Sequence, residues 1–229
     1  MRIQITTRDA VTLPLAHHVE LQHALYSLVD ADQIQVWHEN GRAPRPYTFS
    51  RLLGKTEIKG HSIHFPRGFS WWIHTHDDDL GSQILRKIQE SKVLPLGKQR
   101  VAIQRFRSIP TPEVGDQMLI HTLSPIVADD NVDGKIISYS PYDTEFSRHI
   151  EQNAMKKLRY FLQREGGAGL TIRPLGGIRK ITSWFKTTPI EGYIGTFVLL
   201  GEPEMLQLLF NVGLGRRNGI GFGCFELFE

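Results

Sequence analysis

The sequence of 229 residues contains a single cysteine, Cys224. One cysteine can form neither an intramolecular disulfide nor a cysteine-based zinc site, which is typical of proteins from a reducing cytoplasm. No apolar run approaches membrane length, and the chain opens with a charged, alternating segment rather than a signal peptide. We therefore expect a soluble cytoplasmic protein that does not interact with membranes.

Several enzyme motifs are also missing. The chain has no Gly-x-Ser-x-Gly elbow, no His-Glu-x-x-His zinc motif and no phosphate-binding Walker loop. The composition itself is ordinary, with 40% hydrophobic and 22% charged residues and a formal net charge of +3. Such values indicate a folded globular protein and argue against disorder.

Basic residues occur in groups, although the net charge is small. Four lie between residues 98 and 107, four more between 173 and 186 (Arg179 and Lys180 among them), and Arg216 and Arg217 are adjacent. Clusters on an otherwise balanced surface favour a face that binds a polyanion.

Five glycines are concentrated between residues 213 and 223, with Arg216, Arg217 and Asn218 among them. Glycine permits positive φ angles and a close approach of another backbone, while guanidinium groups match phosphate oxygens. The loop follows an expected helix and precedes an expected strand, the reverse of the order in nucleotide-binding loops. A capped helix followed by a tight turn remains an alternative.

Apolar periodicity predicts a similar succession of strands and helices twice along the chain. These two rounds of elements are separated by a proline-rich linker at 110–113. The first round is expected to contain a strand at 2–8, helices near 21–28 and 32–39, strands at 47–53, 56–65 and 70–75, a helix at 78–91 and a strand at 94–109. The second is expected to contain strands at 118–127 and 135–139, a helix at 140–163, strands at 170–187 and 192–200, a helix at 203–212 and a strand at 222–228.

Both rounds fit the strand–helix–strand–strand–helix–strand order of the ferredoxin-like fold. We therefore predict an α+β protein with two tandem ferredoxin-like (βαββαβ, RRM-like) domains and antiparallel sheets. The predicted domains are residues 1–112, carrying the active site, and 113–229, carrying the glycine-rich loop. The same fold serves RNA-binding modules and small-molecule regulatory domains, so it does not decide the function.

Two groups of histidines could support chemistry. His38 ends an expected helix and precedes a loop that contains Arg45, so an accessible proton-transfer group would lie near a cation. His74, His76 and Asp77 could instead hold a metal ion. The acidic residues there also fit a helix N-terminus, and Trp72 shares a face with His74, so this second group could simply border a core.

Five segments of the chain resemble one known family. They are the loop 212–223 with its closing Gly-Phe-Gly, the segment 123–126, the helix 146–157, the segment 38–50 and the first helix, 17–26. In this order they resemble the Cas6 family of the repeat-associated mysterious protein superfamily. These are CRISPR-associated endoribonucleases that cut precursor CRISPR RNA within its repeats.

The resemblance implies an enzyme that needs no metal and no cofactor. In the family the ribose 2′-OH attacks the adjacent phosphate and leaves a 2′,3′-cyclic phosphate and a 5′-OH. By resemblance His38 is the general acid/base, Tyr26 the first-helix tyrosine, and Arg45 stands where relatives have a lysine. Lys55 or Tyr47 could replace Arg45 in that role. The residues expected to bind RNA are Gly213, Gly215, Arg216, Arg217, Asn218, Gly219, Gly221, Gly223, Arg179 and Lys180.

The expected partner is CRISPR repeat RNA, with a CRISPR effector complex or a homodimer as further assemblies. Two other functions stay open at this point. The superfamily also supplies non-catalytic RNA-binding subunits of effector complexes, which would not need His38. A pair of ferredoxin-like regulatory domains would bind a small molecule and would show no salt-dependent RNA affinity.

Overall fold

A computed structural model describes residues 1–41, 43–165 and 169–228. The first half of the chain forms a four-stranded antiparallel sheet in the order β3-β6-β1-β9. Its strands are β1 (Arg2–Thr6), β3 (Tyr47–Phe49), β6 (Ser70–Thr75) and β9 (Arg105–Ile109). Its helices are α1 (His18–Tyr26), α2 (Ala31–Glu39) and α3 (Asp78–Ser91). Along β1, Ile3 and Ile5 are buried while their neighbours are partly exposed, as period-2 alternation predicts.

Helix α3 shows how local sequence determines one element. The Asp77 carboxylate accepts a hydrogen bond from the Leu80 amide at 3.0 Å and so caps the N-terminus. Leu80, Ile84 and Ile88 form a buried stripe at helical spacing. The helix ends at Ser91, as predicted from the sequence.

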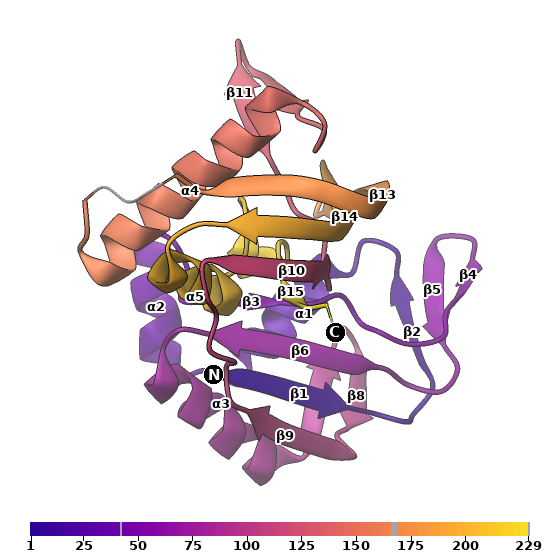
Figure 1. Cartoon of the computed structure of the whole chain (residues 1–229). Helices are drawn as coiled ribbons and strands as arrows, with labels where there is room; N and C mark the ends of the chain where they lie inside the picture. The colour runs from indigo at the N-terminus through magenta and orange to yellow at the C-terminus, as the bar shows by residue number, and fades with distance from the viewer. Residues whose placement is uncertain (42, 166–168, 229) are drawn as a thin grey trace.

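The second half repeats the arrangement with a sheet in the order β13-β14-β10-β15. The strands are β10 (Gln117–Thr122), β13 (Thr171–Phe185), β14 (Thr188–Leu200) and β15 (Phe225–Leu227). The helices are α4 (Thr144–Leu162) and α5 (Pro203–Val212), followed by a short 3-10 helix η1 (Asn218–Ile220). Each half buries its own hydrophobic cluster. Figure 1 shows the second sheet above the first, with the C-terminal end between them.

In both halves the sheet order places the fourth strand of the βαββαβ unit beside the first, which is the ferredoxin-like arrangement. The predicted α+β fold with antiparallel sheets is therefore confirmed. The predicted boundary at 112/113 falls between β9 and β10, and it stays a prediction.

Smaller hairpins account for the differences from the expected elements. The expected strand at 94–109 is wrong, because Gly97 turns the chain at a φ of 59°. This turn gives a separate hairpin, β7 (Val93–Leu96) and β8 (Gln99–Ala102), before β9. The expected strand at 56–65 is likewise two strands, β4 (Glu57–Lys59) and β5 (Ser62–Phe65), which form a three-stranded sheet with β2 (Val11–Pro14).

The second half also contains a projecting hairpin that the sequence predicts only in part. It consists of β11 (Asp129–Val132) and β12 (Lys135–Ser138) and stands at the top of the molecule (Figure 1). Only its second strand was expected, because Asp129-Asp130-Asn131 lacks the apolar alternation of a strand. Among the helices of the described residues, none combines the length and the apolar character that a membrane span requires.

Candidate functional site

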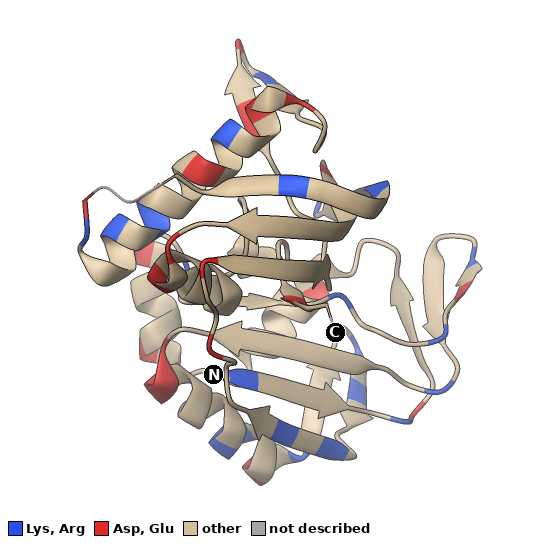
Figure 2. Ribbon diagram, viewed as in Figure 1, with Lys and Arg blue, Asp and Glu red and all other residues tan. Residues whose placement is uncertain are grey.

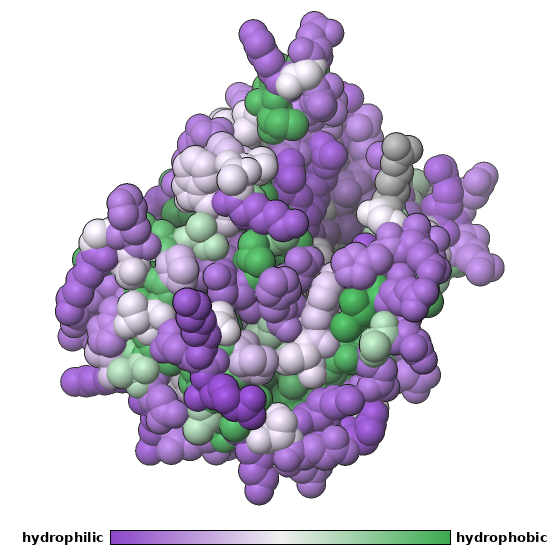
Figure 3. Space-filling view, turned by 180° about the vertical axis from the view of Figure 1, so that it is seen from behind, coloured by the Kyte–Doolittle hydropathy of each residue, from purple (hydrophilic) through white to green (hydrophobic). Residues whose placement is uncertain are grey.

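A cleft of about 1160 Å³ lies between α1, the end of α2, α4, the β13–β14 turn and the glycine-rich loop. Among the described residues that line it, none carries a carboxylate and the following carry a cationic group: Arg45, Lys156, Lys157, Arg159, Lys186, Arg216 and Arg217. In the view from behind, the upper half of the surface is hollowed and largely hydrophilic around the hollow (Figure 3). The size exceeds the roughly 300–1,000 Å³ of small-molecule pockets, which suits a polymer.

His38 lies in the last turn of α2, and its side chain is exposed to the cleft. Its ring meets the Tyr26 ring of α1 edge-on, with 6.0 Å between the ring centroids. Tyr26 also packs against the buried Trp37, which fixes the end of α2 against α1. The structure therefore brings together the two residues that the resemblance paired.

Arg45 is close to His38, but its guanidinium group is bound to the protein. It donates hydrogen bonds to the carbonyl oxygens of Trp37 at 2.5 Å, Ala43 at 3.2 Å and Asn40 at 3.3 Å. A cation at this position satisfies carbonyl groups at the C-terminus of α2 and opposes the negative end of the helix dipole. Arg45 thus holds the turn that carries His38, while a direct contact with substrate stays a prediction.

The alternatives to Arg45 have different positions. Tyr47 is fully buried, and its hydroxyl group donates a hydrogen bond to the Gly219 carbonyl oxygen at 3.3 Å. Burial raises the pKa of Tyr47 well above its usual value, so it remains a neutral donor. Gln22 reaches the same carbonyl oxygen at 3.3 Å. Lys55 is exposed in the β3–β4 connection and is not among the residues that line the cleft.

The glycine-rich loop is held together from within and from α4. The Asn218 amide group donates to the carbonyl oxygens of Leu214 and Phe222 at 3.0 and 2.9 Å. The Lys157 ammonium group donates to those of Gly213 at 2.7 Å and Gly215 at 3.0 Å. Burial lowers the pKa of Lys157 to about 7. This lysine is therefore an internal support of the loop.

Most glycines of the loop face protein atoms. Gly213, Gly215, Gly221 and Gly223 are buried, whereas Gly219 is only partly buried and lines the cleft. A bound RNA strand can contact the four buried glycines only if the loop opens. Their burial gives them a packing role in this structure, and their contact with RNA stays a prediction.

The two loop arginines share one carboxylate. Asp129 of β11 is 3% exposed and is bound by Arg216 at 2.9 Å and by Arg217 at 2.7 Å. Two cations and one anion leave a net positive charge at the edge of the cleft. No sequence pattern predicts this pairing, because the partners are 87 and 88 residues apart.

The other predicted RNA-binding residues lie away from the cleft. Arg179 and Lys180 are exposed on the outer strand β13, and Lys180 forms an ion pair with Glu191 at 2.8 Å. Figure 2 shows basic residues on β13 and on β9, the outermost strands of the two sheets. Neither Arg179 nor Lys180 is among the residues that line the cleft.

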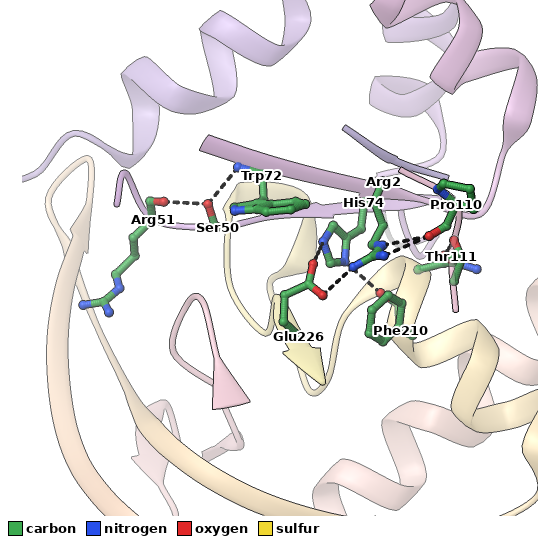
Figure 4. A network of polar contacts seen from close by, with 10 residues as sticks. Arg2, Ser50, Arg51, Trp72, His74, Pro110, Thr111, Phe210 and Glu226 are labelled. Carbon is green, nitrogen blue, oxygen red and sulfur yellow. Dashed lines mark hydrogen bonds and ion pairs between the residues drawn. The ribbon is translucent and has the colours of Figure 1, made fainter. Parts of the chain in front are cut away.

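The second histidine group forms a polar contact between the two halves. His74 is fully buried on β6, and its Nδ1 donates to the Phe210 carbonyl oxygen at 3.1 Å. Its Nε2 lies 3.1 Å from Oε1 of Glu226 on β15, close enough for an ion pair but not aligned as a hydrogen bond. Arg2 of β1 donates to the other carboxylate oxygen at 2.5 Å (Figure 4).

The metal alternative finds no support in this arrangement. The His76 ring does not lie beside His74 but packs against Phe161, with 5.8 Å between the ring centroids. In the part of the chain that the structure describes, no three His, Cys, Asp or Glu side chains form a group that could hold a metal ion.

Replacing Glu226 by alanine is expected to destabilise the protein by about 3 kcal/mol, because it leaves His74 and Arg2 without a carboxylate in a largely buried contact. Urea unfolding at neutral pH measures the loss. The control is Glu191→Ala, which breaks the exposed pair with Lys180 and should cost less than about 1 kcal/mol. Equal losses in the two variants would show that the Glu226 contact does not contribute as a buried pair.

Comparisons with known proteins agree with this fold. Residues 109–227 match the family model for CRISPR associated protein Cas6, C-terminal. The chain is 22% identical over 241 residues to a putative CRISPR-associated endoribonuclease-like protein Cas6nc of Pyrococcus horikoshii, with both chains covered in full.

Solved structures show the same fold. One is a Cas6-related protein of Pyrococcus furiosus, with a TM-score of 0.88 and 20% identity over 100% of this chain and 98% of that one. Another is described as a RAMP protein binding different RNA substrates, with a TM-score of 0.80 and 21% identity over the whole of both chains. A Cas6 product complex has a TM-score of 0.71 and 17% identity over 99% of each chain.

Proposed function

The chain belongs to the Cas6 family of CRISPR-associated proteins, a family involved in CRISPR RNA processing, and from this premise we propose that it is a metal-independent endoribonuclease. Its substrate is precursor CRISPR RNA, which it cuts within the repeats. The products are a 2′,3′-cyclic phosphate and a 5′-OH end.

The observation that carries this proposal is the position of His38. An exposed imidazole lies beside Tyr26 at a cleft whose charged lining residues, among those described, are all cationic. RNA brings its own nucleophile, so the protein has to orient the strand, transfer protons and stabilise negative charge. The site offers groups suited to each of these tasks.

In the proposed reaction the 2′-oxygen forms a bond to phosphorus, and the bond between phosphorus and the 5′-oxygen breaks. The 2′-OH proton passes to a base, and the departing 5′-oxygen takes a proton from an acid. We assign proton transfer to His38 and propose that the Tyr26 hydroxyl contacts the reacting phosphate. Arg45 acts as a positioning residue through the carbonyl groups at the end of α2. This step consumes no water, and we propose that it needs no metal ion.

A 2′-deoxy nucleotide at the cut site tests the reaction directly. Repeat RNA with this single change should bind as unmodified RNA does but remain uncut, because the nucleophile is missing. Unmodified RNA should be cut in excess EDTA and should yield a 2′,3′-cyclic phosphate. Cleavage of the 2′-deoxy substrate, or loss of activity in EDTA, would contradict the proposal.

A second candidate function is an RNA-binding subunit without turnover. It is favoured by the arrangement around Arg45, since the cation expected to assist His38 is already bound to three carbonyl oxygens. The same assay separates the two functions. If repeat RNA binds in a salt-dependent way and no cleavage product forms at any pH tested between 6 and 9, the result would support the function of a non-catalytic subunit.

A further inference from the structure

The cations of the cleft differ in whether they are already bound to the protein. Arg45 and Lys157 donate to backbone carbonyl oxygens. Arg216 and Arg217 bind the buried carboxylate of β11. Arg159 lies 3.6 Å from a glutamate in the segment after α4. These five groups shape the cleft, and a ligand phosphate would have to compete for them.

Two lysines are in a different situation. Lys156 is exposed on α4, and Lys186 is exposed in the turn between β13 and β14. Neither forms an ion pair with any residue that the structure describes, while both line the cleft. The Lys186 ammonium group lies 5.9 Å from the centroid of the Phe185 ring, which holds it near the end of the hairpin. Their charges are thus available to a bound anion.

An aromatic ring lies beside Lys156. Tyr160 follows it by one helical turn, so the two side chains share a face of α4. Tyr160 is 52% exposed although it is large and partly apolar, and it lines the same cleft. Its ring packs edge-on against Phe161, with 5.0 Å between centroids, which limits its motion. An exposed and supported ring of this kind can stack on a nucleobase.

We infer that Lys156, Lys186 and Tyr160 form a nucleotide-binding wall of the cleft, separate from His38 and from the glycine-rich loop. The two ammonium groups contact phosphates of the strand as point charges, and the Tyr160 ring stacks on a base. The ligand is single-stranded RNA flanking the bond that is cut. This inference rests on the proposed function, because it places the substrate of that same cleft. The main phosphate contacts would then come from α4 and the β13–β14 turn, and not from Arg216 and Arg217 as expected from the sequence.

A salt series with repeat RNA tests the wall. The RNA carries a 2′-deoxy nucleotide at the bond that wild type cuts, or is unmodified if wild type cuts none. For the double variant Lys156→Ala/Lys186→Ala, the slope of log affinity against log salt should become shallower by about 1.4 units, since each single-strand phosphate contact adds about 0.7. Tyr160→Ala should lower affinity about tenfold and leave the slope unchanged.

The control double variant, Lys59→Ala/Lys135→Ala, removes the same charge from exposed positions outside the cleft and should change the slope little. A Lys156/Lys186 variant with the wild-type slope, or a control that lowers the slope equally, overturns the inference. So does a wild type without salt-dependent RNA binding. Failure of the proposed function has a different signature, namely RNA binding with the expected change of slope but no cleavage product.

Discussion

Replacing His38 by alanine is expected to slow the cleavage of repeat RNA by about 10²–10⁴-fold, the contribution typical of a positioned proton-transfer group. RNA affinity should change little, because His38 is one exposed residue on a cleft with many cationic groups. Single-turnover cleavage at saturating enzyme measures the chemical step, and a separate binding assay measures affinity. This is the most direct test of the role given to His38.

His23 provides the matched control. It is exposed on α1, the same helix as Tyr26, but does not line the cleft. His23→Ala should therefore cut RNA at the wild-type rate. Normal cleavage by the His38 variant would remove the proposed acid/base and shift attention to Tyr26. Equal slowing in both variants would indicate a general disturbance of the α1–α2 region.

Gly223→Ala is expected to destabilise the protein by more than about 4 kcal/mol or to prevent folding, which only severe packing defects do. A Cβ atom at this position would lie 1.9 Å from the Leu214 carbonyl oxygen and 2.7 Å from the Asn218 side chain. The residue also has a φ of 72°, which costs a residue with a Cβ about 1–2 kcal/mol. Backbone atoms on the other side of the loop cannot rotate away as a side chain can.

Gly60→Ala separates the clash from the backbone strain. Gly60 has a similar φ of 57°, but a Cβ there meets nothing within 4 Å. Only the strain remains, so this variant should lose about 1–2 kcal/mol. Thermal and urea unfolding of the two variants gives the comparison. Similar losses would mean that the glycine-rich loop can relax around an added methyl group and is less tightly packed than the contacts indicate.

The elements that sequence predicted best are those determined by their own residues. Helix α3 combines a capping Asp77 with an apolar stripe, so both its ends were correct. The ferredoxin-like order followed from the period of apolar residues in each half. The predicted strand at 94–109 is too long because it includes the polar stretch Gly97-Lys98-Gln99-Arg100, where the chain turns at Gly97.

The candidate site was predictable only in part. Sequence and resemblance together named His38 and Tyr26, which the structure places in contact. They could not show which cations are bound to the protein, because these partners lie far apart in sequence. Arg217 and Asp129 are 88 residues apart, and Lys157 and Gly213 are 56 residues apart. In the sequence Lys186 belongs to a basic group, but nothing links it to Lys156, since only the fold brings the two side chains to one cleft.

The position of the glycine-rich loop in the chain has a consequence for biosynthesis. Tyr47 and Gln22 donate to the Gly219 carbonyl oxygen, and Arg2 donates to the Glu226 carboxylate. Side chains near the N-terminus therefore find their hydrogen-bond acceptors near the C-terminus. Translation delivers the N-terminal half first, and domains generally fold as they emerge. In a nascent chain, helix α2 with His38 can therefore fold before the C-terminal half has closed the cleft. Because residues 216–220 form part of the cleft lining, the cleft is complete only after the ribosome has released the glycine-rich loop.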